Sequence, residues 1–366
     1  MNVPRASLRQ WQRLSCLRPS APRVHLPVCR RSYSESKGSL AFDTIRSEML
    51  GRNKQYSWDV MSPTNSSLLN ISLADFIPES CQAPTYRAGA KSIEKVDATV
   101  KLPQGHHLVY FPLQKPVSEL CPDMTDPLHS PGGPFERRMW AGGSIEFNDD
   151  FQLDSTPVVC EEAINDVTIK GIEGQEKIFV DVLRDYMKKQ DFESSKSKRI
   201  REHRTLVFMR GVNPEQARAS LLKASEKRGR IVKVPNAPDF SITLTPTPTL
   251  LFNYSALTFN AHLIHLDPEF CREEEGHPNL LVHGPLSLTL MLSVLRSRLG
   301  ADEKVHRIDY RNLAPLYVNN PMRVCVRLIG DGDRSTGEKT RKWEVWAEGY
   351  DGGLSVRGTA VTGPSA

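Results

Sequence analysis

Apolar and polar positions alternate along two stretches that lie far apart in the chain. Residues 144–209 contain short apolar runs separated by turns, among them residues 167–172 and 177–182 around a glycine-bearing turn. Residues 307–363 contain runs of the same kind, again interrupted by glycines. Such runs, bounded by turn residues, are typical of strands and hairpins. The pattern predicts two similar sets of strands, and a duplicated half of about 150 residues suits a chain of this length.

One strongly predicted helix lies between the two sets, at residues 284–300 (GPLSLTLMLSVLRSRLG). Pro285 suits the first helical position, Gly300 suits the stop, and Arg296 and Arg298 fall in the last turn. Apolar side chains face nearly every side of this helix, so the rest of the protein must surround it. Strands that curl around one buried helix give an α+β unit, and two such units would fill the chain.

The first 140 residues give weaker signals. Residues 40–60 look helical at first and then turn-like, and residues 68–77 have helical spacing before a proline. The polar, proline-bearing residues 78–105 predict an irregular segment. The apolar run at 107–113 predicts a short strand, and the proline- and glycine-rich residues 114–136 predict a long loop.

The charge is distributed unevenly. Residues 1–34 hold seven arginines, several serines and no lysine, aspartate or glutamate. This composition is typical of a mitochondrial transit peptide, here with cleavage near residues 30–33, and a disordered basic tail that binds nucleic acid or anionic lipid is the alternative. The net charge is +5, but without the leader 41 basic and 43 acidic side chains remain, a net of −2. That balance argues against nucleic acid as a partner.

Neither a membrane span nor a metal cluster is predicted. No run of about 18 apolar residues occurs, which argues against a transmembrane helix. Seven cysteines are present and none forms a CxxC pair, so zinc clusters and redox dithiols have no support. We expect free thiols in a reducing compartment, and no cofactor or metal.

Three segments carry a family resemblance. Residues 254–267 (YSALTFNAHLIHLD), followed by 280–292 (LLVHGPLSLTLML), strongly resemble the hydratase element of the MaoC-like hot-dog superfamily. Residues 133–147 (GPFERRMWAGGSIEF) resemble the N-terminal dehydratase half of the same proteins. The nearest resemblance is to mitochondrial type 2 hydroxyacyl-thioester dehydratases and mesaconyl-C4-CoA hydratase-like proteins, over roughly residues 60–362. It implies a double hot dog, an α+β fold of two curled antiparallel sheets that each wrap a helix.

The resemblance implies addition or removal of water across the α,β bond of an acyl thioester. That chemistry needs a base, a group that handles the β-hydroxyl or water, and donors for the developing enolate oxygen. His265 is the expected base. Asn260 stands where the bacterial hydratase pattern has Asp; either it orients the water while His265 carries the proton, or Asp267 takes the acid role. A backbone N–H near His283 and Gly284 is expected to bind the enolate oxygen.

Further candidates have competing interpretations. Tyr254 and Phe259 are substrate-binding candidates, with core packing as the alternative. Arg137 and Arg138 could meet a phosphate of CoA or phosphopantetheine, and with Trp140 they could instead be structural. For His265 the alternative is an ordinary buried histidine that bonds a carbonyl. His262 is expected to be structural or to line a pocket.

The predicted domain organisation has four parts. Residues 1–34 are the transit peptide, 40–212 a non-catalytic N-terminal hot-dog domain that shapes the acyl tunnel, 213–235 a linker, and 236–366 the catalytic C-terminal MaoC-like domain. A duplicated hot dog already contains the pairing that single-domain relatives reach by dimerising, so we expect a monomer or a homodimer.

The predicted function is an (R)-3-hydroxyacyl-thioester dehydratase of mitochondrial type II fatty-acid synthesis, in the matrix, acting on acyl carrier protein (ACP) substrates. A hydratase of small branched CoA esters such as mesaconyl-CoA is one alternative, and a non-catalytic protein that binds acyl thioesters is another. Basic clusters at residues 196–204 and 226–230 suggest a contact with the acidic carrier protein, although most such runs are solvated loops.

Overall fold

A 10-stranded sheet forms the framework of the chain in the computed structural model. The structure describes residues 38–83, 100–194, 199–226, 232, 236–331 and 340–365. The predicted transit peptide, the end of the predicted linker at 233–235 and the basic residues 196–198 and 227–230 lie outside these ranges. None of the described helices is long and apolar enough to cross a membrane.

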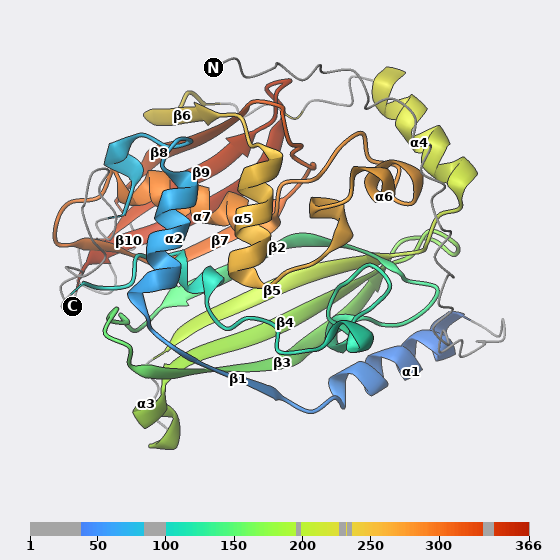
Figure 1. Ribbon diagram of the computed structural model, residues 1–366, viewed down its shortest axis with the longest axis horizontal. Helices are drawn as coiled ribbons and strands as arrows, with labels where there is room; N and C mark the ends of the chain where they lie inside the picture. Colours follow the sequence, from blue (N-terminus) through green and yellow to red (C-terminus); the bar gives the residue numbers. More distant parts are fainter. Residues whose placement is uncertain are drawn as a thin grey trace, which may run out of the picture. The chain divides into compact units, whose positions relative to one another are not determined.

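The strands run antiparallel in the order β1-β3-β4-β5-β2-β7-β10-β9-β8-β6 (Figure 1). Their bounds are β1 Gln55–Val60, β2 Arg137–Phe147, β3 Pro157–Lys170, β4 Lys177–Lys188, β5 Ile200–Met209, β6 Phe240–Leu244, β7 Glu303–Asn312, β8 Met322–Asp331, β9 Arg341–Glu348 and β10 Leu354–Pro364. The first five strands occupy one half of the sheet and the last five the other. Their orders mirror each other, β1-β3-β4-β5-β2 against β6-β8-β9-β10-β7, which confirms the two predicted strand sets.

The two halves meet where β2 pairs with β7. Ser144 lies opposite Asp309 and Ile145 opposite Ile308 in this central pair. Both isoleucines are fully buried, so the junction belongs to the main core rather than to a hinge. The sheet is therefore continuous across the two halves.

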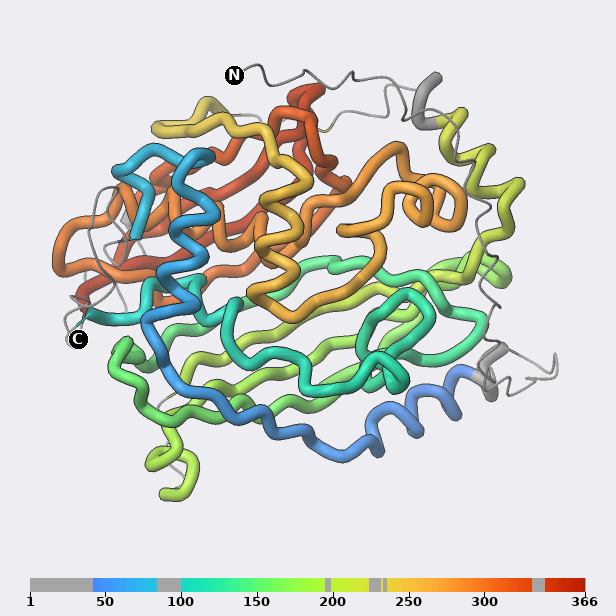
Figure 2. Tube along the Cα trace, viewed as in Figure 1, coloured from blue at the N-terminus to red at the C-terminus, as the bar shows by residue number. Residues whose placement is uncertain are grey.

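The described helices of four or more residues are α1 Gly38–Leu50, α2 Pro63–Leu73, η3 His106–Val109, α3 Lys189–Glu193, α4 Pro214–Glu226, α5 Pro248–Thr258, α6 Pro268–Glu273 and α7 Gly284–Arg296. Shorter turns of 3-10 helix include η4 Val117–Glu119, η5 Pro127–His129 and η6 Leu263–His265. Helix α4 occupies part of the predicted linker. Helices α2 and α5 run beside each other, and Figure 2 shows them as the blue and gold segments of the trace.

Helix α7 is the buried helix that the sequence predicts. It begins at Gly284 with Pro285 in its first turn, and every residue from 286 to 295 is buried. It packs against β7, β8 and β9 of the second half. Each fully buried Leu, Met or Val side chain stabilises the fold by about 1.5–3 kcal/mol relative to exposure. The helix therefore anchors the second half and holds its own first turn in a fixed place.

The first half differs between α2 and β2. Described residues there form only short 3-10 helices and irregular segments. The strand predicted at residues 107–113 is wrong: His106–Val109 form η3, which is buried and contacts α2, α5 and α7. A short apolar run that is buried on all sides has no periodicity to separate strand from helix. The predicted loop at 114–136 is irregular apart from η4 and η5.

The turn predicted for the second part of residues 40–60 is also wrong. Residues 38–50 form α1 as expected, but Gln55–Val60 form β1, which pairs with β3 at the edge of the sheet. Tyr56 and Trp58 of this strand are 46% exposed. Because its aromatic side chains face outward, the strand lacks the apolar inner face that sequence patterns detect.

Candidate active site

A cavity of about 660 Å³ lies between the two halves of the sheet. Strands β2 to β5 and the loop before β2 line it from the first half. Helix α5, the segment after it and the first turn of α7 line it from the second half. Eight residues singled out from the sequence line it: Arg138, Trp140, Tyr254, Phe259, Asn260, His262, His265 and Gly284. His283 and Arg137 do not line it.

His265 is presented to the cavity by η6. Its Nδ1 lies 2.8 Å from the carbonyl oxygen of Leu281, so this nitrogen carries the hydrogen and donates it. Nε2 is then left as the basic atom. The His265 ring stacks on the His283 ring with centroids 3.6 Å apart. Burial lowers the pKa of His265 to about 4, against the hydrogen bond to Leu281, so the imidazole is neutral at physiological pH.

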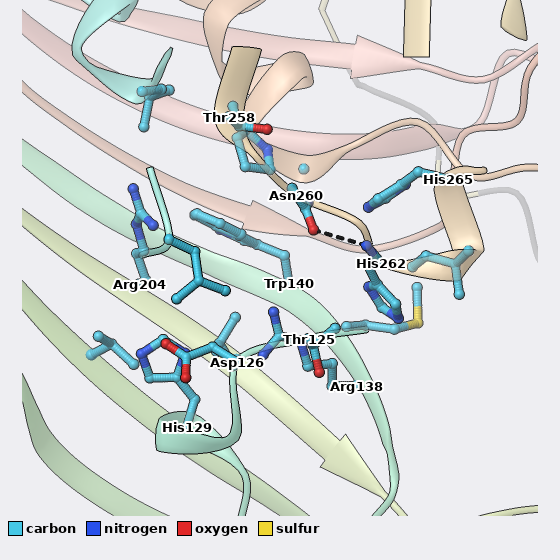
Figure 3. A pocket seen from close by; sticks show the side chains of 18 of the residues that line it. Thr125, Asp126, His129, Arg138, Trp140, Arg204, Thr258, Asn260, His262 and His265 are labelled. Carbon is cyan, nitrogen blue, oxygen red and sulfur yellow. Dashed lines mark hydrogen bonds between the residues drawn. The ribbon is translucent and has the colours of Figure 1, made fainter. Parts of the chain in front are cut away.

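Asn260 is placed by the end of α5. Phe259 ends this helix in the left-handed conformation, with φ 51°, and the N–H of Asn260 donates back to the Ser255 carbonyl at 2.9 Å. The Asn260 Oδ1 accepts the N–H of His262 at 3.1 Å, which is the dashed bond in Figure 3. One side of the amide is thereby fixed. The Asn260 Nδ2 has no partner among the described residues and is available to a ligand.

Gly284 is packed so tightly that a side chain there would force its neighbours to shift. A Cβ atom there would lie 3.0 Å from Cβ and Cγ of Trp140 and 3.2 Å from Nδ2 of Asn312. Because Gly284 starts α7, its N–H has no acceptor within the helix. This N–H and the positive end of the helix dipole favour a negative oxygen at the cavity wall.

His283 directly precedes α7 and does not line the cavity. Its side chain is fully buried, and Nε2 lies 2.9 Å from the Ser255 hydroxyl. Burial lowers its pKa well below the usual range. With one face on the His265 ring, His283 fixes the orientation of the candidate base.

The two aromatic candidates differ in burial. Tyr254 is almost fully buried, with its hydroxyl 3.4 Å from the Thr289 hydroxyl and its ring tilted against His283. Phe259 is 62% exposed at the rim of the cavity, so it is not a core residue.

Arg137 and Arg138 face different surroundings although they are neighbours on β2. Arg137 donates from Nε to the Glu275 carboxylate at 2.7 Å and from Nη2 to the Glu275 carbonyl at 2.8 Å. It therefore ties β2 to the segment after α6 and has a structural role. Trp140 donates from Nε1 to the Tyr310 hydroxyl at 2.8 Å. Arg138 points into the cavity (Figure 3).

His262 also lines the cavity. Its Nε2 lies 3.4 Å from Oδ2 of Asp123, a residue of the long loop before β2. Its ring meets the His265 ring edge to face, with centroids 5.5 Å apart. Burial, aided by His265 and Arg138, lowers its pKa well below the usual range. The loop of the first half thus reaches the candidate base of the second half.

Sequence reasoning missed a network of charged residues on the floor of the cavity. Arg184 pairs with Glu162 at 2.9 Å, and Glu162 also bonds Nε2 of His129 at 2.9 Å. Arg204 pairs with Glu202 at 2.7 Å, and Tyr186 bonds the same carboxylate. Burial alone raises the pKa of Glu162, but His129 and Arg184 outweigh it and hold that pKa well below its usual range. The floor of the cavity therefore consists of charged side chains that are paired with one another.

The only signal for this network was charge at alternate positions of strands. Glu202 and Arg204 are two residues apart on β5, as are Arg184 and Tyr186 on β4, so each pair shares one face. The sequence alone does not show which face of each strand points inward, so charged residues of this kind are interpreted as solvent-exposed.

Three of these floor residues could also hold a cation. Possible ligand atoms of Asp126, His129 and Glu162 lie within 4.8 Å of one another. Because Arg184 already pairs with Glu162, the group is satisfied as an ion-pair network.

Three comparisons with known proteins agree. A family model described as hydroxyacyl-thioester dehydratase type 2 matches residues 105–318. The mitochondrial hydroxyacyl-thioester dehydratase type 2 of Schizosaccharomyces pombe is 29% identical and covers 75% of this chain and 90% of that protein. The mesaconyl-C(4)-CoA hydratase of Chloroflexus aurantiacus is 30% identical and covers 72% and 84%. A MaoC-like dehydratase structure from Phytophthora capsici matches with a TM-score of 0.58 at 12% identity, covers 87% and 97%, and shows the fold.

Proposed function

The chain belongs to the hydroxyacyl-thioester dehydratase type 2 family, and we propose that it removes water reversibly from (R)-3-hydroxyacyl thioesters to give trans-2-enoyl thioesters. It is a hydro-lyase, as are the dehydratases and the hydratase that it matches. The observation that carries the proposal is the placement of His265. Its Nδ1–H is fixed on a carbonyl, its Nε2 bonds to none of the described residues, and it lines the same cavity as Asn260 and Gly284.

One histidine suffices for the proton chemistry. In dehydration, Nε2 of His265 takes the hydrogen from C2 as the C2=C3 double bond forms and the C3–O bond breaks. The same proton then passes to the departing hydroxyl, which leaves as water. The Nδ2 of Asn260 holds that hydroxyl, and the N–H of Gly284 binds the thioester oxygen, where negative charge develops. Hydration runs through the same steps in reverse.

We expect Asn260→Ala to lower kcat about 100-fold, because the hydroxyl or water is then no longer oriented. Asn260→Asp should stay within about tenfold of wild type, since a carboxylate keeps the acceptor for the His262 N–H. Steady-state hydration of trans-2-butenoyl-CoA measures both. Asn279→Ala, outside the cavity, is the matched control. Wild-type kcat in Asn260→Ala would remove Asn260 from the mechanism.

The pH dependence follows from the lowered pKa of His265. Only the neutral imidazole acts as the base, so activity is present above its pKa and lost as the pH falls through it. With that pKa at about 4, kcat/KM for hydration should stay level from neutral pH to about pH 5. An ordinary histidine would give an acid limb near 6.5. Brief pH-jump assays measure the profile before acid unfolding, and a limb at or above 6.5 would contradict the assigned base.

The carrier and the compartment are also proposals. We propose ACP substrates in mitochondrial type II fatty-acid synthesis, in the matrix, supported by the Arg-rich leader and the mitochondrial relative. The described arginines of the basic cluster at 196–204 give no support to a carrier surface. Arg199 and Arg201 pair with Asp185, and Arg204 pairs with Glu202. A contact at residues 196–198 or 227–230 lies outside the described residues.

The second candidate is the hydration of small branched CoA esters. A mesaconyl-C(4)-CoA hydratase is among the relatives, and the cavity holds an unpaired arginine, Arg138. Loss of enoyl-thioester absorbance, followed with short-chain, medium-chain and mesaconyl substrates on CoA and on ACP, decides between the candidates. Medium-chain ACP substrates turned over fastest would support the first candidate. No turnover of any substrate would leave the remaining alternative, a protein that only binds acyl thioesters.

A further inference from the structure

We propose that Arg138 binds a carboxylate carried by the acyl group of the substrate, on or next to the carbon that gains or loses the hydroxyl. This inference rests on the proposed function and deepens its second candidate, because it names the residue that would select a carboxylated acyl group. The preferred substrates would then be short acyl thioesters with a second, free carboxylate, in place of the medium-chain acyl groups of the first candidate.

The first step of the argument is the unmet bonding of Arg138. Its Nη1 atom is enclosed and has no hydrogen-bond partner in the described part of the chain. Among the described residues, no carboxylate oxygen lies within 4.0 Å of a guanidinium nitrogen of Arg138, which is the distance limit for an ion pair. A guanidinium is always charged, and a buried charge is normally paired. An anion from outside the chain would complete the site.

Three arginines in or next to the cavity have the carboxylate partner that Arg138 lacks among the described residues. Arg137 pairs with Glu275 at 2.7 Å, Arg184 with Glu162 at 2.9 Å and Arg204 with Glu202 at 2.7 Å. Each of these has a buried carboxylate of its own. Arg138 lines the same cavity as Arg184 and Arg204 but is left without one.

The acids nearest to Arg138 are engaged elsewhere. The Oδ1 of Asp123 accepts from the N–H and the hydroxyl of Thr125, and its Oδ2 faces His262. The Oδ1 of Asp126 accepts the N–H of Leu128. These carboxylates act on Arg138 at longer range and favour its charged form, although burial lowers its pKa overall.

The position of Arg138 tells which part of the substrate it would meet. Trp140, two residues along β2, packs where Gly284 begins α7, and residues two apart on a strand share a face about 7 Å apart. On this inference the thioester oxygen lies at Gly284, C2 lies at His265, and the carbon next to C2 is the part of the acyl group that Arg138 meets. The charge of Arg138 acts on both His262 and His265, and Figure 3 shows it on their side of the cavity.

A carboxylate is the anion that fits these requirements. It accepts two parallel hydrogen bonds from a guanidinium, which satisfies Nη1 and pairs the charge. An alkyl chain in the same place would exclude water from the guanidinium and would offer it no hydrogen-bond acceptor. The floor made by Glu162, Arg184 and Arg204 adds further polar surface to the cavity. Charge and bonding therefore favour the same class of acyl group.

The test uses two acyl groups that differ only at C3. Saturated 3-carboxybutyryl-CoA and 3-methylbutyryl-CoA cannot react, so calorimetry measures binding alone. We expect the carboxylated ligand to bind wild type about 100-fold more tightly, as a charge-assisted hydrogen bond to a buried partner allows. Arg138→Met should remove that difference, and Arg138→Lys should keep part of it, because a lysine retains the charge without the fork.

The matched control is Arg137→Met, which changes the neighbouring arginine outside the cavity and should keep the preference. If Arg138→Met unfolds, wild type and Arg138→Lys alone still decide the question. Equal binding of the two ligands to wild type would overturn the inference.

Turnover separates this inference from the proposed function. Hydration of trans-2-butenoyl-CoA without any carboxylate preference in binding would uphold the function and reject the role of Arg138. A carboxylate preference without hydration of any enoyl thioester, carboxylated or not, would uphold the binding site and reject the function.

Discussion

We expect the replacement of His265 with alanine to lower kcat for hydration of trans-2-butenoyl-CoA by about 1000-fold, with KM within about threefold. The loss falls on kcat because Nε2 acts on a hydrogen in transit, whereas the substrate is held by other groups. The Leu281 carbonyl keeps Nε2 free in the wild type, and His283 stacks behind the ring. Steady-state kinetics on folded variants, checked by thermal melting, gives the number.

His277→Ala is the matched control for this loss. His277 is also buried enough that its pKa falls to about 4, and its Nδ1 bonds the Tyr317 hydroxyl at 3.1 Å. It does not line the cavity, so its loss should leave kcat within about twofold. An active His265→Ala protein would show that another group moves the proton.

Gly284→Ala should lower kcat/KM by about 100-fold and destabilise the fold by about 1–3 kcal/mol. The added methyl group would lie 3.0 Å from Trp140, so the first turn of α7 or the tryptophan must shift. Either shift moves the N–H that we propose binds the thioester oxygen. Kinetics and denaturant unfolding measure the two effects separately.

Gly300→Ala is the control for the change from glycine to alanine. Nothing lies within 4 Å of a Cβ at Gly300, which follows the end of α7. We expect wild-type kinetics and stability there. If Gly284→Ala were equally harmless, the N–H of Gly284 would have no special place in catalysis.

The sequence predicted the second half better than the first. Residues 286–295 are an apolar run preceded by Pro285. This pattern predicts a buried helix, and α7 confirms the prediction. In the first half, Val109 and its neighbours are buried in η3, not in a strand. No period distinguishes the two when every side is covered. The paired strand sets were visible because their glycines and alternation recur.

The candidate site could be predicted only within the segments that carry the family resemblance. His265 and Asn260 are close in sequence, and the structure places both at the cavity. The floor network joins β3, β4 and β5, so its charges could be recognised as inward-facing only once the register of these strands was known.

Arg137 and Arg138 show the same limit for neighbours. From the sequence both are basic residues on one strand. Their difference comes from Glu275, which is distant in the sequence and meets only Arg137. Long-range pairing of this kind leaves no trace in a local pattern.

Division of labour between the halves follows from these placements. The second half supplies the proposed base, the water holder and the helix start, while the first half supplies the ionic floor and Arg138. Substitutions in the second half should therefore change the rate of the reaction, and substitutions in the first half should change which substrate is preferred. Variants of His265 should alter kcat with all substrates, whereas variants of Arg138 should alter the ranking of substrates.

The most direct test of the account is where the oxygen of water enters the substrate. Purified protein is incubated with trans-2-butenoyl-CoA in oxygen-18-labelled water, and the products are analysed by mass spectrometry. The account predicts intact 3-hydroxybutyryl-CoA with the label on C3, formed by wild type and almost absent with His265→Ala. Label in a free carboxylic acid would mean that the site hydrolyses thioesters, and unlabelled, unchanged substrate would mean that it does not activate water.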